Sequence, residues 1–336
     1  MPSSGADASE EDPAWLKAKG DDFYRGGDFL SALNVYSAAI DMDEHLTACY
    51  SNRSACYLRL NMTAECRLDC TEGIRQLDDE LSAMGSTSAS ASALSESAAK
   101  EVIALKSLLS KLLLRRGSAN CQMGLFSEAV HDYTRASNLL FGFEGKSTSK
   151  KDGHDERYEE RELSLPGITR ASLSADLSIM SRLLSADILK KEGDALFADN
   201  LLAESCLKYE TALLSVPVHV GCLSNRSACR LAMKDTVGCI QDCSSALSLL
   251  MDSDSDSSGG EISMLRSILP PKGSDKRTQW VVKTLVRRGT AFAQLAQLDE
   301  AVEDFRRASA MDPKNEVLKS DLNKILNYRE GKRTAS

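Results

Sequence analysis

Small and apolar residues recur along the chain at spacings of three, four and seven, which are the spacings of one face of an α-helix. Leu16, Gly20 and Phe23 lie on one face of a first predicted helix, and Ala32 and Tyr36 lie on one face of a second. A Gly-Gly-Asp sequence separates the two, so we expect a helix, a short turn and a second helix. Glycine in mid-helix costs about 1 kcal/mol relative to alanine, and close packing of a neighbouring helix would explain it at Gly20.

The same helix-turn-helix pattern returns five more times. It covers Asn52–Ile74 and Arg115–Leu139 in the first half of the chain. In the second half it returns around paired positions of small or aromatic residues, which are Gly193 and Tyr209, Ala228 and Cys243, and Gly289 and Phe305. The chain therefore consists of six helix pairs, which fall into two groups of three.

The two groups are copies of one another. The hexapeptide Ser51–Cys56 recurs letter for letter 173 positions later (224 − 51), and Leu114–Gly117 recurs with one change after 172 positions (287 − 115). Lys17 and Asp21 recur as Lys190 and Asp194, again 173 positions later (190 − 17). Three separated motifs that keep their order and spacing indicate a duplicated structural module.

Stretches without helical periodicity divide these modules. Serine, alanine or charged residues dominate them, so we expect them to be flexible and solvated. The predicted organisation is a disordered tail over 1–13, a first module over 14–143 with an insertion at 78–99, a linker over 144–182, a second module over 183–330 with an acidic, serine-rich insertion at 251–276, and a tail over 331–336.

Two further expectations concern the serine run in the second insertion and the ends of the modules. The serines within 252–258 have an acidic context, so they are either kinase sites or part of a plain solubilising linker. Each module should also end in an extra helix with a polar outer face, which for the second module covers about Asn315–Arg329.

Composition excludes several classes of protein. The net charge of −8 argues against a general nucleic-acid or acidic-membrane binder, because phosphate contact needs a basic field. No apolar run approaches the roughly 20 residues of a membrane span, and the first residues lack the basic and apolar regions of a signal peptide. With only 5% aromatic residues, the chain suits helix packing through leucine and alanine. We expect an all-α protein in the cytoplasm.

The chain also lacks the usual signatures of a metal site or an enzyme. Its ten cysteines form no Cys-x-x-Cys pair and its four histidines are scattered, so buried thiols in a reducing compartment are the expected state. There is no phosphate loop, no Gly-x-Ser-x-Gly elbow and no His-Glu-x-x-His motif. We therefore expect no catalytic residue, no cofactor and no metal.

The repeats resemble the tetratricopeptide repeat, whose helix pairs stack into a solenoid. The resemblance is clearest over Arg288–Phe292, followed by Ala301, Phe305 and Asp312-Pro313. It implies that the first helix of each pair lines the inside of the solenoid. Polar residues that repeat on these first helices should then converge in a groove.

Those polar residues resemble the carboxylate clamps of three-repeat co-chaperone modules, which grip the acidic C-terminal tails of Hsp70 or Hsp90. The resemblance implies a peptide-binding set in each module, which is Lys17, Asp21, Asn52, Lys111 and Arg115 in the first and Lys190, Asp194, Asn225, Lys283 and Arg287 in the second. Lysine and arginine would supply charge-assisted hydrogen bonds, and asparagine would donate without adding charge.

One position departs from the clamp pattern in both modules. The clamp family has asparagine where this chain has Asp21 and Asp194. Two like charges about 4 Å apart repel by roughly 1 kcal/mol in water and about 4 kcal/mol at a partly buried site. Asp21 should therefore weaken the binding of a free carboxylate, unless Lys17 neutralises it, or it should select a different ligand.

Among co-chaperones, the chain resembles the repeat region of axonemal dynein assembly factors of the dyslexia-susceptibility type. The similar segments are Trp15–Gly20, Asn52–Cys56, Val286–Leu295 and Asp312–Asn315. That family usually has one module, and the two-module layout is nearer to the Hsp70–Hsp90 organising proteins. The resemblance implies an adaptor that holds Hsp90 or Hsp70 tails and assists assembly of axonemal dynein, with a further expected link to the cilium.

An alternative interpretation keeps the fold and changes the ligand. The grooves could instead bind an internal helix or an extended segment of a partner protein, without chaperone contact. Asp21 and Asp194 favour this alternative, because they oppose a free carboxylate. Replacing Arg115 and Arg287 by alanine separates the two hypotheses.

Overall fold

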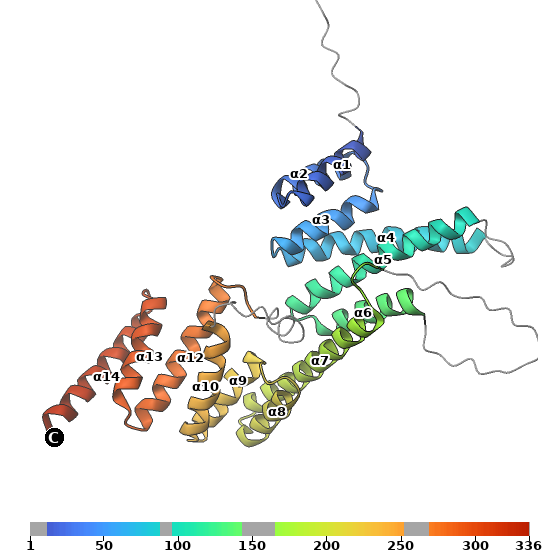
Figure 1. Cartoon of the computed structure of the whole chain (residues 1–336). Helices are drawn as coiled ribbons and strands as arrows, with labels where there is room; N and C mark the ends of the chain where they lie inside the picture. Colours follow the sequence, from blue (N-terminus) through green and yellow to red (C-terminus); the bar gives the residue numbers. More distant parts are fainter. Residues whose placement is uncertain (1–11, 88–95, 143–164, 252–268, 336) are drawn as a thin grey trace, which may run out of the picture. The chain divides into compact units, whose positions relative to one another are not determined.

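The computed structural model describes residues 12–87, 96–142, 165–251 and 269–335 (Figure 1). The chain divides into two compact units, Met1–Met180 and Ser181–Ser336. No helix of the described residues is long and apolar enough to cross a bilayer. The predicted all-α fold with helix-pair repeats is confirmed.

The first unit contains three helix pairs in which each helix packs on the next. The pairs are α1 (Pro13–Arg25) with α2 (Phe29–Met42), α3 (Thr47–Arg59) with α4 (Thr63–Thr87), and α5 (Glu96–Gln122) with α6 (Phe126–Phe141). Side chains cap the first two helices, because Asp12 accepts from the Ala14 N–H and Asp28 accepts from the Ser31 N–H.

The second unit repeats this plan. Its helices are the later part of α7 (Arg170–Ala198), then α8 (Leu202–Ser215), α9 (Val220–Ala232), α10 (Thr236–Met251), α12 (Asp275–Gln294), α13 (Leu298–Met311) and α14 (Glu316–Ala335). The helix predicted at 315–329 is α14, which packs against α13.

Glycine–aromatic contacts join the two helices of a pair. A Cβ atom at Gly20 would lie 2.5 Å from the Tyr36 ring, and one at Gly117 would lie 2.5 Å from the Tyr133 ring. The second unit repeats the arrangement at Gly193 and Gly289, which lie under Tyr209 and Phe305. The close approach expected at Gly20 is therefore present, and it explains why a residue with no side chain stands in mid-helix.

Buried ion pairs also join the helices of a pair. In each, an arginine of the first helix donates through Nε and Nη2 to both carboxylate oxygens of an aspartate 16 residues later on the second helix. The pairs are Arg53–Asp69, Arg116–Asp132, Arg226–Asp242 and Arg288–Asp304. These arginines are therefore structural, and their parallel N–H donors fix the orientation of the second helix.

The segments between the repeats are more helical at their ends than the sequence indicates. Helix α4 continues to Thr87 and α5 starts at Glu96, so only 88–95 of the insertion predicted at 78–99 falls outside the described residues.

Helix α7 starts at Arg170, well inside the linker predicted at 144–182. Arg170 donates to the Phe141 carbonyl at 2.7 Å, so the start of α7 provides the first module with its extra helix. The serine run at 252–258 lies outside the described residues.

The cysteines line the helix interfaces as free thiols, and all but Cys206 are buried. The described residues contain no cluster of histidine, cysteine and acidic side chains that could hold a metal ion.

Candidate peptide-binding grooves

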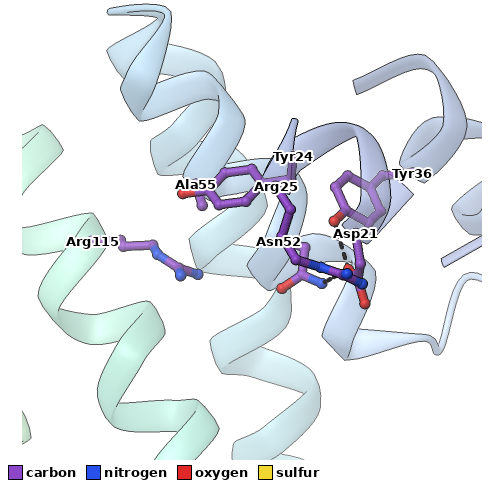
Figure 2. Close-up of a pocket in the computed structure, with 7 residues that line it drawn as sticks. All are labelled: Asp21, Tyr24, Arg25, Tyr36, Asn52, Ala55 and Arg115. Carbon is purple, nitrogen blue, oxygen red and sulfur yellow. Dashed lines mark hydrogen bonds between the residues drawn. The ribbon is translucent and has the colours of Figure 1, made fainter. Parts of the chain in front are cut away.

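Four helices of the first unit form a cavity of about 320 Å³ (Figure 2). Helices α1, α3 and α5, the first helix of each pair, contribute most of its wall, and α2 contributes one tyrosine. The lining residues are Asp21, Tyr24, Arg25, Tyr36, Asn52, Ala55 and Arg115. The structure therefore brings Asp21, Asn52 and Arg115 together, as the sequence predicts, from positions up to 94 residues apart (115 − 21).

Asp21 is the centre of a hydrogen-bond network in this cavity. Its Oδ1 accepts from the Tyr36 hydroxyl at 2.6 Å and from the Asn52 amide at 2.7 Å, and Figure 2 shows both bonds. Its Oδ2 accepts from the Lys17 ammonium at 2.8 Å. Lys17 therefore neutralises Asp21, and the pair carries no net charge.

The network determines the charge state of the carboxyl group. Burial alone would raise the pKa of Asp21, but the hydrogen bonds from Lys17 and Tyr36, the Lys17 charge and the Asn52 amide together lower it below its ordinary value of 3.8. Burial and the neighbouring carboxylate raise the pKa of the Tyr36 hydroxyl well above its ordinary value of 10.0. At neutral pH the network is thus an ionised carboxylate surrounded by three donors.

Arg115 lies at the α5 end of the cavity with no acidic partner among the described residues. Its Nη1 donates to the carbonyl oxygen and the hydroxyl of Ser51, the latter at 2.7 Å. Its Nε and Nη2 make no hydrogen bond within the described ranges. One edge of the guanidinium is therefore anchored, and the other edge is available for a ligand.

Lys111 lies one helical turn before Arg115. It is exposed, makes no ion pair with any residue that the structure describes, and does not line the cavity. It adds a second cation to the α5 end of the groove without being fixed there.

The second unit reproduces the network atom for atom. Asp194 accepts from Tyr209 at 2.6 Å, from Asn225 at 2.7 Å and from Lys190 at 2.6 Å. Its pKa is lowered in the same way, since these donors outweigh the effect of burial. The two modules thus place the same three donors around one carboxylate.

Arg287 occupies the position of Arg115 in the second unit. Its Nη1 donates to the Ser224 carbonyl and to the hydroxyls of Ser224 and Ser227, each hydroxyl at 3.0 Å. Lys283 is exposed and lines a different cavity of about 350 Å³, where it lies with Asp312 and Asn315. This cavity is not lined by Arg287, so the structure does not bring Lys283 and Arg287 together there, whereas it pairs Lys190 with Asp194.

The sequence interpretation missed the tyrosines and serines of the site. Tyr36 and Tyr209 match a helix core pattern, and their rings are indeed buried, but their hydroxyls reach the groove. Ser51 and Ser224 stand inside the repeated hexapeptide, so the identical letters were a signal for them. Nothing in the sequence indicated that their oxygens anchor an arginine of the next repeat.

No protein-family model matches the chain. The chain is 33% identical over 178 residues to dynein axonemal assembly factor 4 of Rattus norvegicus, which is 52% of this chain and 37% of that protein. It is 24% identical over 274 residues to mitochondrial import receptor subunit TOM34 of Homo sapiens, which is 70% of this chain and 79% of that protein. The match thus spans little more than a third of the assembly factor.

Solved structures with similar folds are tetratricopeptide-repeat domains. One is the first such domain of Spaghetti (RPAP3) bound to the HSP90 peptide SRMEEVD, with a TM-score of 0.33, 21% identity, and coverage of 44% of this chain and 94% of that one. Another is the TPR2AB domain of yeast Sti1 in its pHSP90 complex, with a TM-score of 0.30, 15% identity, and coverage of 93% of this chain and 96% of that one. The chain is thus similar in sequence to an assembly factor and to an import receptor subunit, and its described residues form an all-α fold of helix-pair repeats.

Proposed function

We propose that the protein is a non-catalytic adaptor whose two grooves bind acidic peptide tails of the kind that Hsp90 and Hsp70 carry at their C-termini. The observation that supports this proposal most directly is the hydrogen bonding of Arg115 and Arg287. Each is held by serine oxygens and has no carboxylate partner among the described residues.

The geometry of these arginines suits a carboxylate ligand. Because Nη1 is already bound, the guanidinium loses little freedom when a ligand arrives. The Nε and Nη2 edge can then donate two parallel hydrogen bonds to one carboxylate, as the same edge of Arg116 does to Asp132 inside the fold. Lys111 adds positive charge one turn away and would attract an acidic segment.

The similar proteins agree with this proposal. The RPAP3 domain was solved with an HSP90 peptide, and dynein axonemal assembly factor 4 is named for the assembly of axonemal dynein. By this similarity the client is an axonemal dynein or a comparable complex assembled in the cytoplasm. Linking two grooves in one chain raises avidity for a partner that presents two tails, through effective concentration.

A second candidate function is a scaffold that binds internal segments of a partner without chaperone contact. The observation that favours it is that Lys17 and Asn52 already donate hydrogen bonds to Asp21. These donors are then not free for the terminal carboxylate of a ligand. Both candidates use the groove, but only the first requires an acidic ligand at Arg115.

The test is calorimetric titration of the whole protein with the peptide SRMEEVD. We expect two sites in the wild type, one in Arg115→Ala, one in Arg287→Ala, and none in the double variant. Loss of a charge-assisted pair of about 1.5–3 kcal/mol weakens a site by roughly 10- to 100-fold.

The matched control is Arg67→Ala with Arg306→Ala, which removes the same charge from the second helices α4 and α13, outside the groove. The control should bind as the wild type does. If the double variant Arg115→Ala/Arg287→Ala binds the peptide as tightly as the wild type, the proposal is wrong. Tight binding of a neutral helical segment that survives the double substitution would support the scaffold instead.

A further inference from the structure

Each groove already contains a carboxylate that belongs to the protein. Asp21 accepts hydrogen bonds from three groups, and Asp194 accepts from the equivalent three, at 2.6–2.8 Å. An ammonium, an amide and a hydroxyl that converge on one carboxylate are the donors that a groove would otherwise offer to a ligand carboxylate. The protein thus supplies this carboxylate itself.

The charges of the groove are consequently uneven. At the α1 end, Lys17 and Asp21 form an ion pair with Nζ and Oδ2 2.8 Å apart, so their charges cancel. At the α5 end, Arg115 and Lys111 have no acidic partner within the described ranges. The second unit has the same division between Lys190–Asp194 and Arg287. Arg25 of α1 also lines the first cavity, but it pairs with Asp22, with Nη2 and Oδ1 2.9 Å apart. Among the described groove residues, the cations without an acidic partner therefore lie at the α5 or α12 end.

From this arrangement we propose that Asp21 and Asp194 are specificity-determining residues that make the grooves indifferent to a free C-terminal carboxylate. The acidic side chains of the ligand bind at Arg115 and Arg287. The terminal carboxylate gains nothing at the other end, because attraction to Lys17 is offset by repulsion from Asp21. The ligand class is thus any acidic segment, internal or terminal. The inference rests on the proposed function, since it narrows which acidic peptides the grooves accept.

Asparagine at these two positions would change the charge balance at the Lys17 end and the Lys190 end of the grooves. In Asp21→Asn the Lys17 ammonium loses its carboxylate partner, and the new amide adds a donor without adding charge. A ligand's terminal carboxylate could then replace the Asp21 carboxylate among the same donors. We expect affinity for the free acid to rise by about tenfold or more, while affinity for an amidated peptide stays nearly constant.

The experiment compares SRMEEVD as the free acid with the same peptide as its C-terminal amide. It titrates both into the full-length wild type and into Asp21→Asn/Asp194→Asn. The control, Asp41→Asn/Asp199→Asn, makes the same charge change at exposed positions outside the networks and away from the lining of the first cavity. We expect the wild type and the control to bind acid and amide within about threefold of each other, and the Asp21→Asn/Asp194→Asn protein to prefer the acid by at least tenfold.

The acid-to-amide ratio of the wild type needs no variant, so the inference can be tested even if Asp21→Asn/Asp194→Asn folds poorly. A wild-type protein that prefers the acid by tenfold or more overturns the inference and leaves the proposed function standing. A wild-type ratio near one, together with acid preference in Asp21→Asn/Asp194→Asn, supports both. If neither peptide binds to any of the three proteins, the proposed function is wrong and the inference falls with it.

Discussion

Arg115 and Arg116 are neighbours on one helix, yet their environments have opposite consequences. Arg116 binds both oxygens of the buried Asp132, so its charge is used inside the fold. Arg115 points to the groove and binds only neutral oxygens of Ser51 among the described residues. The sequence indicates that both matter, because the pair recurs at 287 and 288. It cannot assign the two roles, since one helical residue step of about 100° decides which side chain faces the groove.

At the same scale, the Tyr36 hydroxyl gives a test of the Asp21 network. Tyr36→Phe keeps the ring on Gly20 and removes one donor to the carboxylate, so the pKa of Asp21 should rise. We expect a loss of about 1.5–3 kcal/mol in the free energy of unfolding at pH 7, which is typical of a hydrogen bond to a charged group. Urea denaturation of both proteins measures this difference.

The pH dependence of that loss has a definite sign. The pKa of Asp21 is lowered in the folded state, so the stabilisation from its donors is present above its ordinary value of 3.8 and is lost as the pH falls through the lower, folded value. The difference between wild type and Tyr36→Phe should therefore shrink in acid. Tyr133→Phe is the control, because that hydroxyl makes no hydrogen bond within the described ranges. An equal loss in both variants would contradict the role of the network.

At the scale of the element, the helix pairs could be predicted and their ends could not. The helical period identifies six pairs, and a glycine–aromatic spacing marks four of them, because a helix buried on one face must repeat small residues where it touches its partner. The start of α7 at Arg170 was not predicted, although Leu173, Met180 and Leu183 are buried at the helical spacings of seven and three. The charged stretch before them and the lack of a glycine–aromatic pair hid this signal.

The start of α9 differs from its counterpart in the first unit. His219 caps α9 by accepting from the Cys222 N–H at Nδ1 over 3.1 Å, whereas α3 begins after Leu46, which has no side-chain cap. Only a neutral imidazole can accept in this way. Burial, and then the Lys190 charge, lower the pKa of His219 below 6.5, although Asp187 and Asp194 oppose the shift.

This cap makes the second unit sensitive to mild acid. The folded pKa of His219 is lowered, so its contribution to stability is present above about pH 6.5 and is lost as the pH falls through the lower, folded value. We expect His219→Leu, which copies the first unit, to destabilise α9 by about 0.5–2 kcal/mol at pH 7.5 and to flatten the dependence on pH. Urea denaturation at pH 7.5 and pH 5 measures both effects. Parallel losses in wild type and variant would exclude the cap as the cause.

At the scale of the whole molecule, the chain has two compact units and two tryptophans, with Trp15 in one unit and Trp280 in the other. Fluorescence can therefore follow each unit separately in Trp15→Phe and Trp280→Phe backgrounds. Arg116→Ala leaves the buried Asp132 carboxylate without a cation and with the Asn120 amide as its remaining donor, which costs about 3–5 kcal/mol. We expect it to lower the unfolding transition reported by Trp15 and to leave the Trp280 transition in place. Equal shifts of both transitions would show that the two units unfold as one.

The Tyr36 side chain belongs to the core through its ring and to the groove through its hydroxyl. For protein engineering, this means that the carboxylate network can be moved to another protein only together with the packing beneath it. A designer who grafts Lys17, Asp21 and Asn52 onto another repeat scaffold must also graft the tyrosine and the glycine that makes room for it. The duplicated chain contains two such networks, around Asp21 and around Asp194. A design can use either one as its template.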